Sequence, residues 1–504
     1  MSTLFNCSVD APVVATTKGP VRGYTFKGIN IFKGIPYGRA KRFHAPEPTE
    51  TWENVFDATS FGCVCPLMNM DKPMGELMVP HRFWIQDEDC LNLNIWAPQE
   101  DADNLPVMVW LHGGGFFAGS SIEHICYEGE NMAREGKCVV VSLNHRLNIL
   151  GYMDLSDFGP EYANSGNAGG DDIILALKWV HDNIASFGGN PDNVTLFGQS
   201  GGGCKITALL QSPAADGLYH RGIIMSGVVG ATANLPDSIG SGRKCVEAIM
   251  SELGVATAAE LETVPYASLA AAYNKVAPAL KKAGENVGMT PHPNEFYLGD
   301  PMTNEIGFRP ETKHIPLVVG TVFSEFMGFF EKVASLTPAE LFDKDTADRL
   351  TELFAQAYPD KNPNRVLALD TTFRGATVPY IQKRAADGST VYSYLFAQDF
   401  PLLGTRGAWH CADIPFVFHN TELSPVCNFE GSKELESKIF DAVMSFATTS
   451  TPGWEACTKD TENTMIIDQS WHMVQNHDHE LLKVLAPLTG QIMAAGIGDG
   501  QLQH

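Results

Sequence analysis

The clearest chemical signal in the sequence is a serine between glycines. Residues 198–202 read Gly-Gln-Ser-Gly-Gly, a G-x-S-x-G pattern that follows the apolar segment 194–197 and precedes the helix-like segment 204–210. A strained strand-to-helix turn of this kind pushes a serine hydroxyl outward, and small neighbours let the backbone bend and a substrate approach. The pattern therefore predicts Ser200 as a nucleophile, with an ordinary glycine-rich turn as the alternative.

A second glycine run lies upstream of this serine. Residues 112–116 read His-Gly-Gly-Gly-Phe and follow a continuous apolar segment. Glycines in that position let backbone N–H groups point into a cavity, where they stabilise the oxyanion of a tetrahedral intermediate. We expect an oxyanion hole formed by Gly114, Gly115 and Gly201, with a purely structural glycine turn as the alternative.

Strand patterns surround both motifs. Two nearly continuous apolar runs, at 107–111 and 139–143, are typical of strands buried on both faces of a sheet. Further strand candidates lie at 194–197, 222–225, 316–319 and 391–396. Helical segments separate them, and this alternation predicts a mainly parallel α/β sheet. The first hundred residues instead alternate short strand-like runs with turns, which predicts an antiparallel edge. The clearest helix is expected to begin at Asp171 as its N-cap.

The length of 504 residues would suggest two domains by default. The sequence nevertheless contains no Pro/Ser-rich linker, no internal repeat and no low-complexity block. Ala-rich helical patterns lie between core strands rather than in a separate segment. We therefore expect one domain over residues 1–504, with insertions near 61–84, 231–310 and 330–385.

Composition and charge narrow the class of protein. With 44% hydrophobic and 19% charged residues, the chain belongs with ordinary globular proteins. The formal net charge of -24 argues against nucleic-acid binding, which needs clustered Lys and Arg. No apolar run is long enough to span a bilayer, and the first residues have no signal-peptide pattern. We expect a small-molecule substrate, no nucleic acid, and a cytoplasmic location, or secretion if a signal has been removed.

Together with these motifs, the chain resembles the type-B carboxylesterase and cholinesterase family of α/β-hydrolases over nearly its whole length. The resemblance rests on the two glycine motifs and on residues 32–37 (FKGIPY), 88–94 (EDCLNLN), 187–191 (FGGNP) and 409–410 (WH). It implies the α/β-hydrolase fold, with a large, mostly parallel central sheet flanked by helices and with inserted helical and loop segments over the active site. It also implies a serine carboxylesterase that works through an acyl-enzyme intermediate and needs no cofactor.

The resemblance also implies the rest of a catalytic triad. Glu325, in the segment 320–325, falls where the family has its triad acid, and His410 falls where it has its base. The order Ser, Glu, His is the order expected for this fold. Asp413 is the competing acid, although its position after the histidine favours a role in the following segment. Ser226 resembles a serine that supports the acid, with a routine strand-end hydroxyl as the alternative.

The sequence departs from the family beside the nucleophile. Gln199 stands where glutamate is usual, which removes a negative charge, and Gly201 stands where alanine is usual. Methionines and aromatic residues in the segment 65–84 suggest an adaptable apolar lining, although packing onto the core is the alternative. We therefore expect neutral, moderately lipophilic esters as substrates, bound by a set of apolar residues: Phe116, Met68, Met70, Met74 and Trp409.

Parts of the sequence are also compatible with other functions. An amidase or lipase-like hydrolase would share the triad, and a catalytically dead scaffold of the same fold would normally lack one of its members. Cys65 and Cys90 match a disulfide of secreted relatives, but a cytosolic setting favours free thiols. His472, His477 and His479 are expected to be surface histidines rather than metal ligands, so no metal site is predicted.

Overall fold

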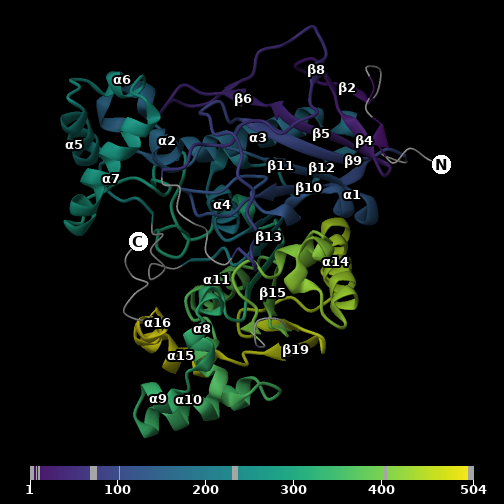
Figure 1. The fold of residues 1–504 in the computed structure, drawn as a ribbon, viewed down its shortest axis with the longest axis vertical. Coiled ribbons are helices and arrows are strands. Elements are labelled where there is room, and N and C mark those ends of the chain that lie inside the picture. Colours follow the sequence, from purple (N-terminus) through teal and green to yellow (C-terminus); the bar gives the residue numbers. More distant parts are fainter. Residues whose placement is uncertain are drawn as a thin grey trace. The chain divides into compact units, whose positions relative to one another are not determined.

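The apolar runs of the sequence form strands in the computed structural model, which describes residues 5–6, 8, 12–68, 76–100, 103–229, 237–401 and 406–497. The chain divides into two compact units (Figure 1). The first unit comprises residues 1–72, 82–222 and 235–312, and the second comprises residues 73–81, 223–234 and 313–504. The expectation of a single domain stays a prediction.

In the first unit, parallel strands follow an antiparallel edge. The strand order is β1 (Phe5–Asn6), β4 (Tyr24–Phe26), β5 (Ile29–Pro36), β9 (Asn92–Pro98), β11 (Val139–Leu143), β10 (Leu105–Leu111) and β12 (Gly189–Gln199). Strand β10 pairs in parallel with β11 and β12, whereas β9 pairs antiparallel with β5 and β11. The predicted antiparallel edge and parallel centre are therefore both confirmed. Small strands complete the unit: β2 (Val13–Ala15), β3 (Pro20–Arg22), β6 (Gly38–Arg39), β7 (Glu47–Pro48) and β8 (Phe56–Asp57).

The helices of the first unit are α1 (Glu130–Gly136), α2 (Asn148–Tyr152), α3 (Ala168–Asn183), α4 (Gly201–Leu209), α5 (Arg243–Leu253), α6 (Ala258–Leu261) and α7 (Tyr266–Lys282). Helix α3 begins at Ala168, after Asn167, and not at Asp171 as predicted. Asp171 was chosen because aspartate is a favoured N-cap residue, but it lies within the first turn of the helix. A Cβ at Gly169 would lie 2.5 Å from the carbonyl oxygen of Arg146, so this glycine permits close packing within a continuous helix. Helices α5 and α7 pack around a buried apolar cluster that includes Phe43 and Ile149.

The second unit repeats the alternation of strands and helices. Its strand order is β13 (Arg221–Met225), β14 (Leu317–Val322), β15 (Val391–Phe396), β18 (Asn463–Ile467) and β19 (His472–Gln475), and β16 (Asp399–Phe400) pairs with β17 (Arg406–Gly407). Strands β14, β15 and β18 pair in parallel. The helices are α8 (Glu331–Ser335), α9 (Pro338–Leu341), α10 (Lys344–Ala357), α11 (Phe373–Ala386), α13 (Ile414–Val417), α14 (Ser432–Thr449), α15 (His479–Leu485) and α16 (Thr489–Ile497).

Burial of the parallel strands explains their composition. Every residue of β11, β14 and β15 is buried, as expected for parallel strands covered on both faces. These strands alternate with helices along the chain, which confirms the predicted α/β class. Within the described ranges, no helix has both the length and the apolar character needed to cross a membrane.

Candidate active site

Ser200 lies at the turn between β12 and α4, in the first unit. Its φ of 56° and ψ of −126° lie in a region that residues other than glycine rarely adopt. The neighbouring glycines leave room for this turn, because a Cβ at Gly202 would lie 1.9 Å from the carbonyl oxygen of Leu111. The structure therefore places Ser200 at a strained strand-to-helix turn, where a nucleophile is presented in this class of fold.

The glycine loop that follows β10 lies against the start of α4. Gly114 and Gly115 have φ values of 83° and 62°. A Cβ at Gly201 would lie 2.2 Å from the carbonyl oxygen and 2.4 Å from the nitrogen of Gly115. A Cβ at Gly113 would lie 3.5 Å from Cβ of Ser200. The three glycines predicted to form an oxyanion hole are therefore brought together beside the serine.

Glu325 and His410 meet in the second unit. Nδ1 of the imidazole hydrogen-bonds Oε2 of Glu325, and the backbone N–H of His410 donates to the Glu325 carbonyl at 3.0 Å. Glu325 is fully buried and His410 is 5% exposed. The carboxylate also accepts a hydrogen bond from the Val322 N–H at 2.9 Å. The acid predicted from the sequence is therefore positioned by the end of β14 and bonded to the predicted base.

Ser226 gives the acid a further partner. Its Oγ donates to Oε1 of Glu325 at 2.5 Å, and its backbone N–H donates to Gly320 at 2.8 Å. Ser226 and Glu325 have φ values of 47° and 43°. Backbone strain of this kind costs about 1–3 kcal/mol per residue and concentrates at functional sites. The side chain of Ser226 thus hydrogen-bonds the carboxylate that is the predicted acid, and its supporting role stays a prediction.

Two aromatic rings cover the imidazole. The ring of Phe326 lies 4.4 Å from the His410 ring, centroid to centroid, and the ring of Phe373 lies 5.1 Å away. Phe326 is 44% exposed, whereas Phe373 is buried. Neither phenylalanine was identified from the sequence, because the loop after Glu325 and the start of α11 meet only in the folded chain.

Two more buried carboxyl groups lie near Glu325. Asp370 accepts hydrogen bonds from the backbone N–H groups of residues 372–374, and burial together with the charge of Glu325 raises its pKa to about 7. Asp413 accepts a hydrogen bond from the Tyr394 hydroxyl at 2.8 Å. Burial, with a smaller effect of Glu325, raises the pKa of Asp413 to about 7. Asp413 is thus bound by a tyrosine, while Glu325 is the carboxylate bonded to the imidazole. Asp370 had no motif to mark it.

The predicted substrate-binding residues fall into different surroundings. Phe116 is 5% exposed and packs edge-on against Tyr152, and Trp409 is 1% exposed and packs against Phe400. Both rings are buried, and their contact with substrate stays a prediction. Met68 is half-buried and packs on the cluster that contains Phe43 and Ile149. Met70 and Met74 lie outside the described residues.

The residues beside the nucleophile and its loop complete the first-unit site. Gln199 is buried, with Oε1 3.5 Å from where a Cβ of Gly113 would be. Phe117, the neighbour of Phe116, is 41% exposed, and its ring lies 2.5 Å from the position of a Cβ at Gly115. Phe116 was the residue predicted from the sequence, whereas the turn exposes Phe117.

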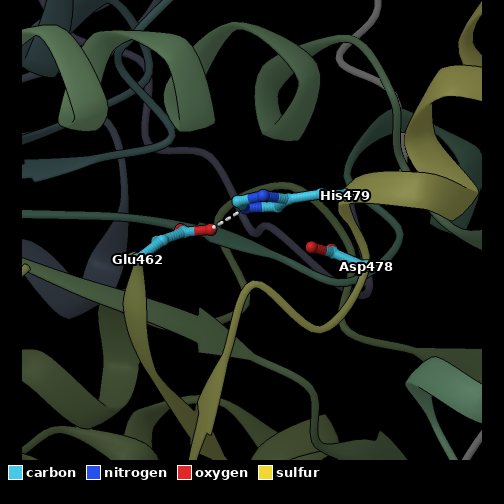
Figure 2. A group of neighbouring side chains, drawn as sticks. All are labelled: Glu462, Asp478 and His479. Carbon is cyan, nitrogen blue, oxygen red and sulfur yellow. Dashed lines mark hydrogen bonds and ion pairs between the residues drawn. The ribbon is translucent and has the colours of Figure 1, made fainter. Parts of the chain in front are cut away.

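One of the three C-terminal histidines is not at the surface. The side chain of His477 is 7% exposed, so the expectation of a surface residue was wrong for it. Figure 2 shows His479 hydrogen-bonded to Glu462, with Asp478 beside them, and their ligand atoms lie within 4.8 Å of one another. Arg374 is fully buried among them and bonds Glu462 at 2.7 Å and Asp478 at 2.9 Å.

Arg374 determines whether this cluster could bind a metal ion. Burial would raise the pKa of Glu462, but the charge of Arg374 and the hydrogen bonds from His479 and Arg374 together outweigh burial and hold that pKa at about 2. The guanidinium occupies the carboxylate oxygens that a divalent cation would need. The cluster is therefore a buried ion-pair network within the second unit.

Cys65 and Cys90 are buried free thiols. The hydrogen bond between the Cys90 and Cys65 thiols, together with burial, raises the pKa of Cys90 well above its usual range. A high thiol pKa disfavours thiolate chemistry. Their reduced state in the native environment stays a prediction.

Comparisons with known proteins give this geometry its context. Residues 10–494 match the carboxylesterase family. The para-nitrobenzyl esterase of Bacillus subtilis (strain 168) is 33% identical over 509 residues, covering 95% of this chain and 99% of that protein. Among solved structures, an esterase from the anaerobe Clostridium hathewayi, described as able to hydrolyse aliphatic aromatic polyesters, is 51% identical with a TM-score of 0.90, covering 95% of this chain and 98% of that one.

A further solved structure extends the likeness. A carboxylesterase from Geobacillus stearothermophilus is 30% identical with a TM-score of 0.74, and the alignment covers 94% of this chain and 99% of that one. The family match and these relatives extend over nearly the whole sequence, so they include the serine turn, the glycine loop and the buried acid–histidine pair. The chain therefore belongs to the carboxylesterase family and is a carboxylic ester hydrolase with the α/β-hydrolase fold.

Proposed function

We propose that this carboxylesterase uses Ser200 as its nucleophile, His410 as the general base and Glu325 as the acid that orients the base. One observation carries the proposal: Ser200 has a strained backbone at the end of β12, and the glycine beside it is in contact with Gly115. This arrangement presents a hydroxyl next to backbone N–H donors, which acyl transfer requires.

The proposed reaction has two halves. In the first, Oγ of Ser200 attacks the ester carbonyl carbon while His410 takes the hydroxyl proton. The N–H groups of Gly114, Gly115 and Gly201 bind the resulting oxyanion. Collapse of this intermediate breaks the bond to the alcohol, which leaves with the proton from His410. In the second half, His410 takes a proton from water, which attacks the acyl-serine. The bond from the acyl carbon to Oγ of Ser200 then breaks, His410 returns the proton to Oγ, and the acid is released.

The proposed substrates are neutral, moderately lipophilic carboxylic esters. An uncharged amide precedes the nucleophile, so the attraction for a cationic choline group is reduced at that position. Half-exposed aromatic rings lie next to the proposed catalytic groups. Phe117 lies at the glycine loop, and Phe326 lies over the His410 imidazole. The description of the Clostridium hathewayi relative, which includes aromatic polyesters, supports substrates with apolar and aromatic groups.

Two measurements test the proposal. Ser200→Ala should lose about 10⁶-fold in kcat, as loss of a serine nucleophile does elsewhere, and should no longer be labelled by a fluorophosphonate. For the wild type, kcat/KM should rise from p-nitrophenyl acetate through butyrate to hexanoate, because each buried methylene contributes up to about 0.8 kcal/mol.

The same series separates the alternatives. Acetylcholine and butyrylcholine should be poorer substrates than neutral esters of equal acyl length, and p-nitroanilides poorer still. A preference for choline esters, a steady fall from acetyl onward, or faster anilide cleavage would contradict the proposed substrate class. Turnover by Ser200→Ala would contradict the proposed nucleophile.

A further inference from the structure

A lysine is buried directly behind the glycine loop. Lys205 lies on α4, five residues after the proposed nucleophile, and is 1% exposed. Its Nζ donates a hydrogen bond to the carbonyl oxygen of His112 at 2.8 Å. Lysine is almost never fully buried without a partner, because removing an ammonium group from water is unfavourable. A buried lysine whose ammonium group donates to a backbone carbonyl therefore calls for a specific role.

The carbonyl that Lys205 binds begins a series of anchored peptide planes. The His112 imidazole is bonded through Nδ1 to the Gly113 carbonyl at 2.9 Å, and the Ala118 N–H donates to the Gly114 carbonyl at 2.9 Å. In a trans peptide, the C=O of one residue and the N–H of the next lie in one plane and point in opposite directions. Fixing these three carbonyl groups therefore fixes the direction of the N–H groups of residues 113–115.

Glycine makes such anchoring necessary. Gly114 and Gly115 have positive φ values, and glycine loses more conformational freedom on ordering than any other residue. An oxyanion hole requires donors that are already oriented when charge develops on the substrate oxygen. The anchors must therefore come from outside the glycine run, and Lys205 supplies the first of them.

The surroundings of the lysine disfavour a charge on the neighbouring imidazole. The His112 ring stacks on the His145 ring at 5.0 Å between centroids. Burial, with Lys205 as the next cause, lowers the pKa of His112 well below its usual range. Burial lowers the pKa of Lys205 to about 7, against the charges of Cys204 and Glu123. His112 is thus kept neutral, with Nδ1–H as the donor that the Gly113 carbonyl requires.

We propose that Lys205 is a positioning residue for ester hydrolysis: its hydrogen bond to the His112 carbonyl, followed by the imidazole bond to Gly113, aims the Gly114 N–H at the oxyanion. This inference rests on the proposed function, because it concerns the same oxyanion hole. Lys205 acts through the loop and does not touch the substrate.

The test compares Lys205→Met with the wild type. Methionine keeps an unbranched apolar chain but removes the N–H donors and the charge. We expect kcat for p-nitrophenyl butyrate to fall by about 10- to 100-fold, less than the loss of an oxyanion donor itself, which is about 10²- to 10³-fold. KM should change by less than about threefold. Lys178→Met, on the exposed face of α3, is the matched control and should leave kcat unchanged.

A second measurement tests stabilisation of the oxyanion separately from turnover. An aryl trifluoromethyl ketone adds the serine oxygen to its carbonyl carbon and so forms a tetrahedral oxyanion. Its inhibition constant should rise in Lys205→Met by the same factor by which kcat falls. If Lys205→Met fails to fold, Lys205→Gln keeps an uncharged donor and should show a smaller loss in both quantities.

The results that would overturn the role of Lys205 differ from the result that would refute the proposed function. Ketone affinity within twofold of the wild type, with or without a fall in melting temperature, would overturn the proposal and leave Lys205 a packing residue. A fall in kcat without weaker ketone binding would overturn it as well. Turnover by Ser200→Ala would instead refute the proposed function, whatever the behaviour of the lysine variants.

Discussion

Glu325 binds His410 through both its side chain and its backbone. Its carboxylate accepts a hydrogen bond from Nδ1, and its carbonyl accepts one from the His410 N–H at 3.0 Å. Because a carboxylate only accepts, Nδ1 carries the proton and Nε2 is the basic nitrogen of the ring. The residue that sets the tautomer therefore also holds the backbone from which the imidazole projects.

Glu325→Gln should retain the fold but lose about 10⁴-fold in kcat, as the corresponding acid-to-amide change does in a serine protease. The amide stabilises an imidazolium poorly and can present N–H where an acceptor is needed. Asp413→Asn should cost less than about tenfold, because Asp413 is bound by Tyr394. Steady-state kinetics of both variants with one ester decide the assignment, and a reversed order of effects would show that Asp413 is the acid.

Ser226→Ala should lower kcat by about 10- to 100-fold with little change in KM. The substitution removes the 2.5 Å hydrogen bond to Glu325, and a hydrogen bond to a charged group contributes about 1.5–3 kcal/mol. Ser393→Ala is the matched control, because Ser393 is also buried in the second unit but bonds Glu462 at 2.8 Å. Equal losses of kcat in the two variants would mean that both act through general destabilisation.

Gly201→Ala should displace the glycine loop, because the added Cβ would lie 2.2 Å from the Gly115 carbonyl oxygen. We expect kcat to fall at least about tenfold, since the displaced N–H groups belong to the proposed oxyanion hole. Gly170→Ala, where nothing lies within 4 Å of the new Cβ, should instead stabilise α3 by about 0.5–1 kcal/mol. Undiminished activity of Gly201→Ala in a kinetic assay would show that the loop adapts.

The pH dependence of stability should report the burial of Asp413. Its pKa is raised from 3.8 to about 7 by burial. A group with a raised folded-state pKa contributes stability that is present below its unfolded pKa and is lost as pH rises through its folded pKa. Relative to the wild type, Asp413→Asn should therefore gain stability between about pH 4 and pH 7, by at most about 4 kcal/mol. Urea unfolding across this range measures the difference, and a constant difference would contradict the shifted pKa.

Local patterns predicted the elements well. Apolar strand patterns gave β11 and β15 at their observed bounds, because parallel strands are buried on both faces. The serine turn was also predictable, since its motif is local. Glu325 and His410 needed the family resemblance, because 85 residues separate them along the chain.

The residues that the sequence did not predict depend on contacts made by the folded chain. Asp370 approaches Glu325, and Phe373 covers His410, without any sequence signature. Lys205 was overlooked because lysine is normally exposed, and His477 was expected at the surface for its polarity. Each of these depends on which segments the tertiary fold brings together, and hydrophobic periodicity does not encode that.

Ser200, Ser226 and Glu325 share one backbone property, a positive φ at a residue other than glycine. Glycine at any of the three would relieve conformational strain, while removing a side chain on which hydrolysis is proposed to depend. Selection for heat resistance alone would thus favour inactive descendants at these positions. Directed evolution of a more durable enzyme from this sequence must select for turnover in every round, or hold these three codons fixed.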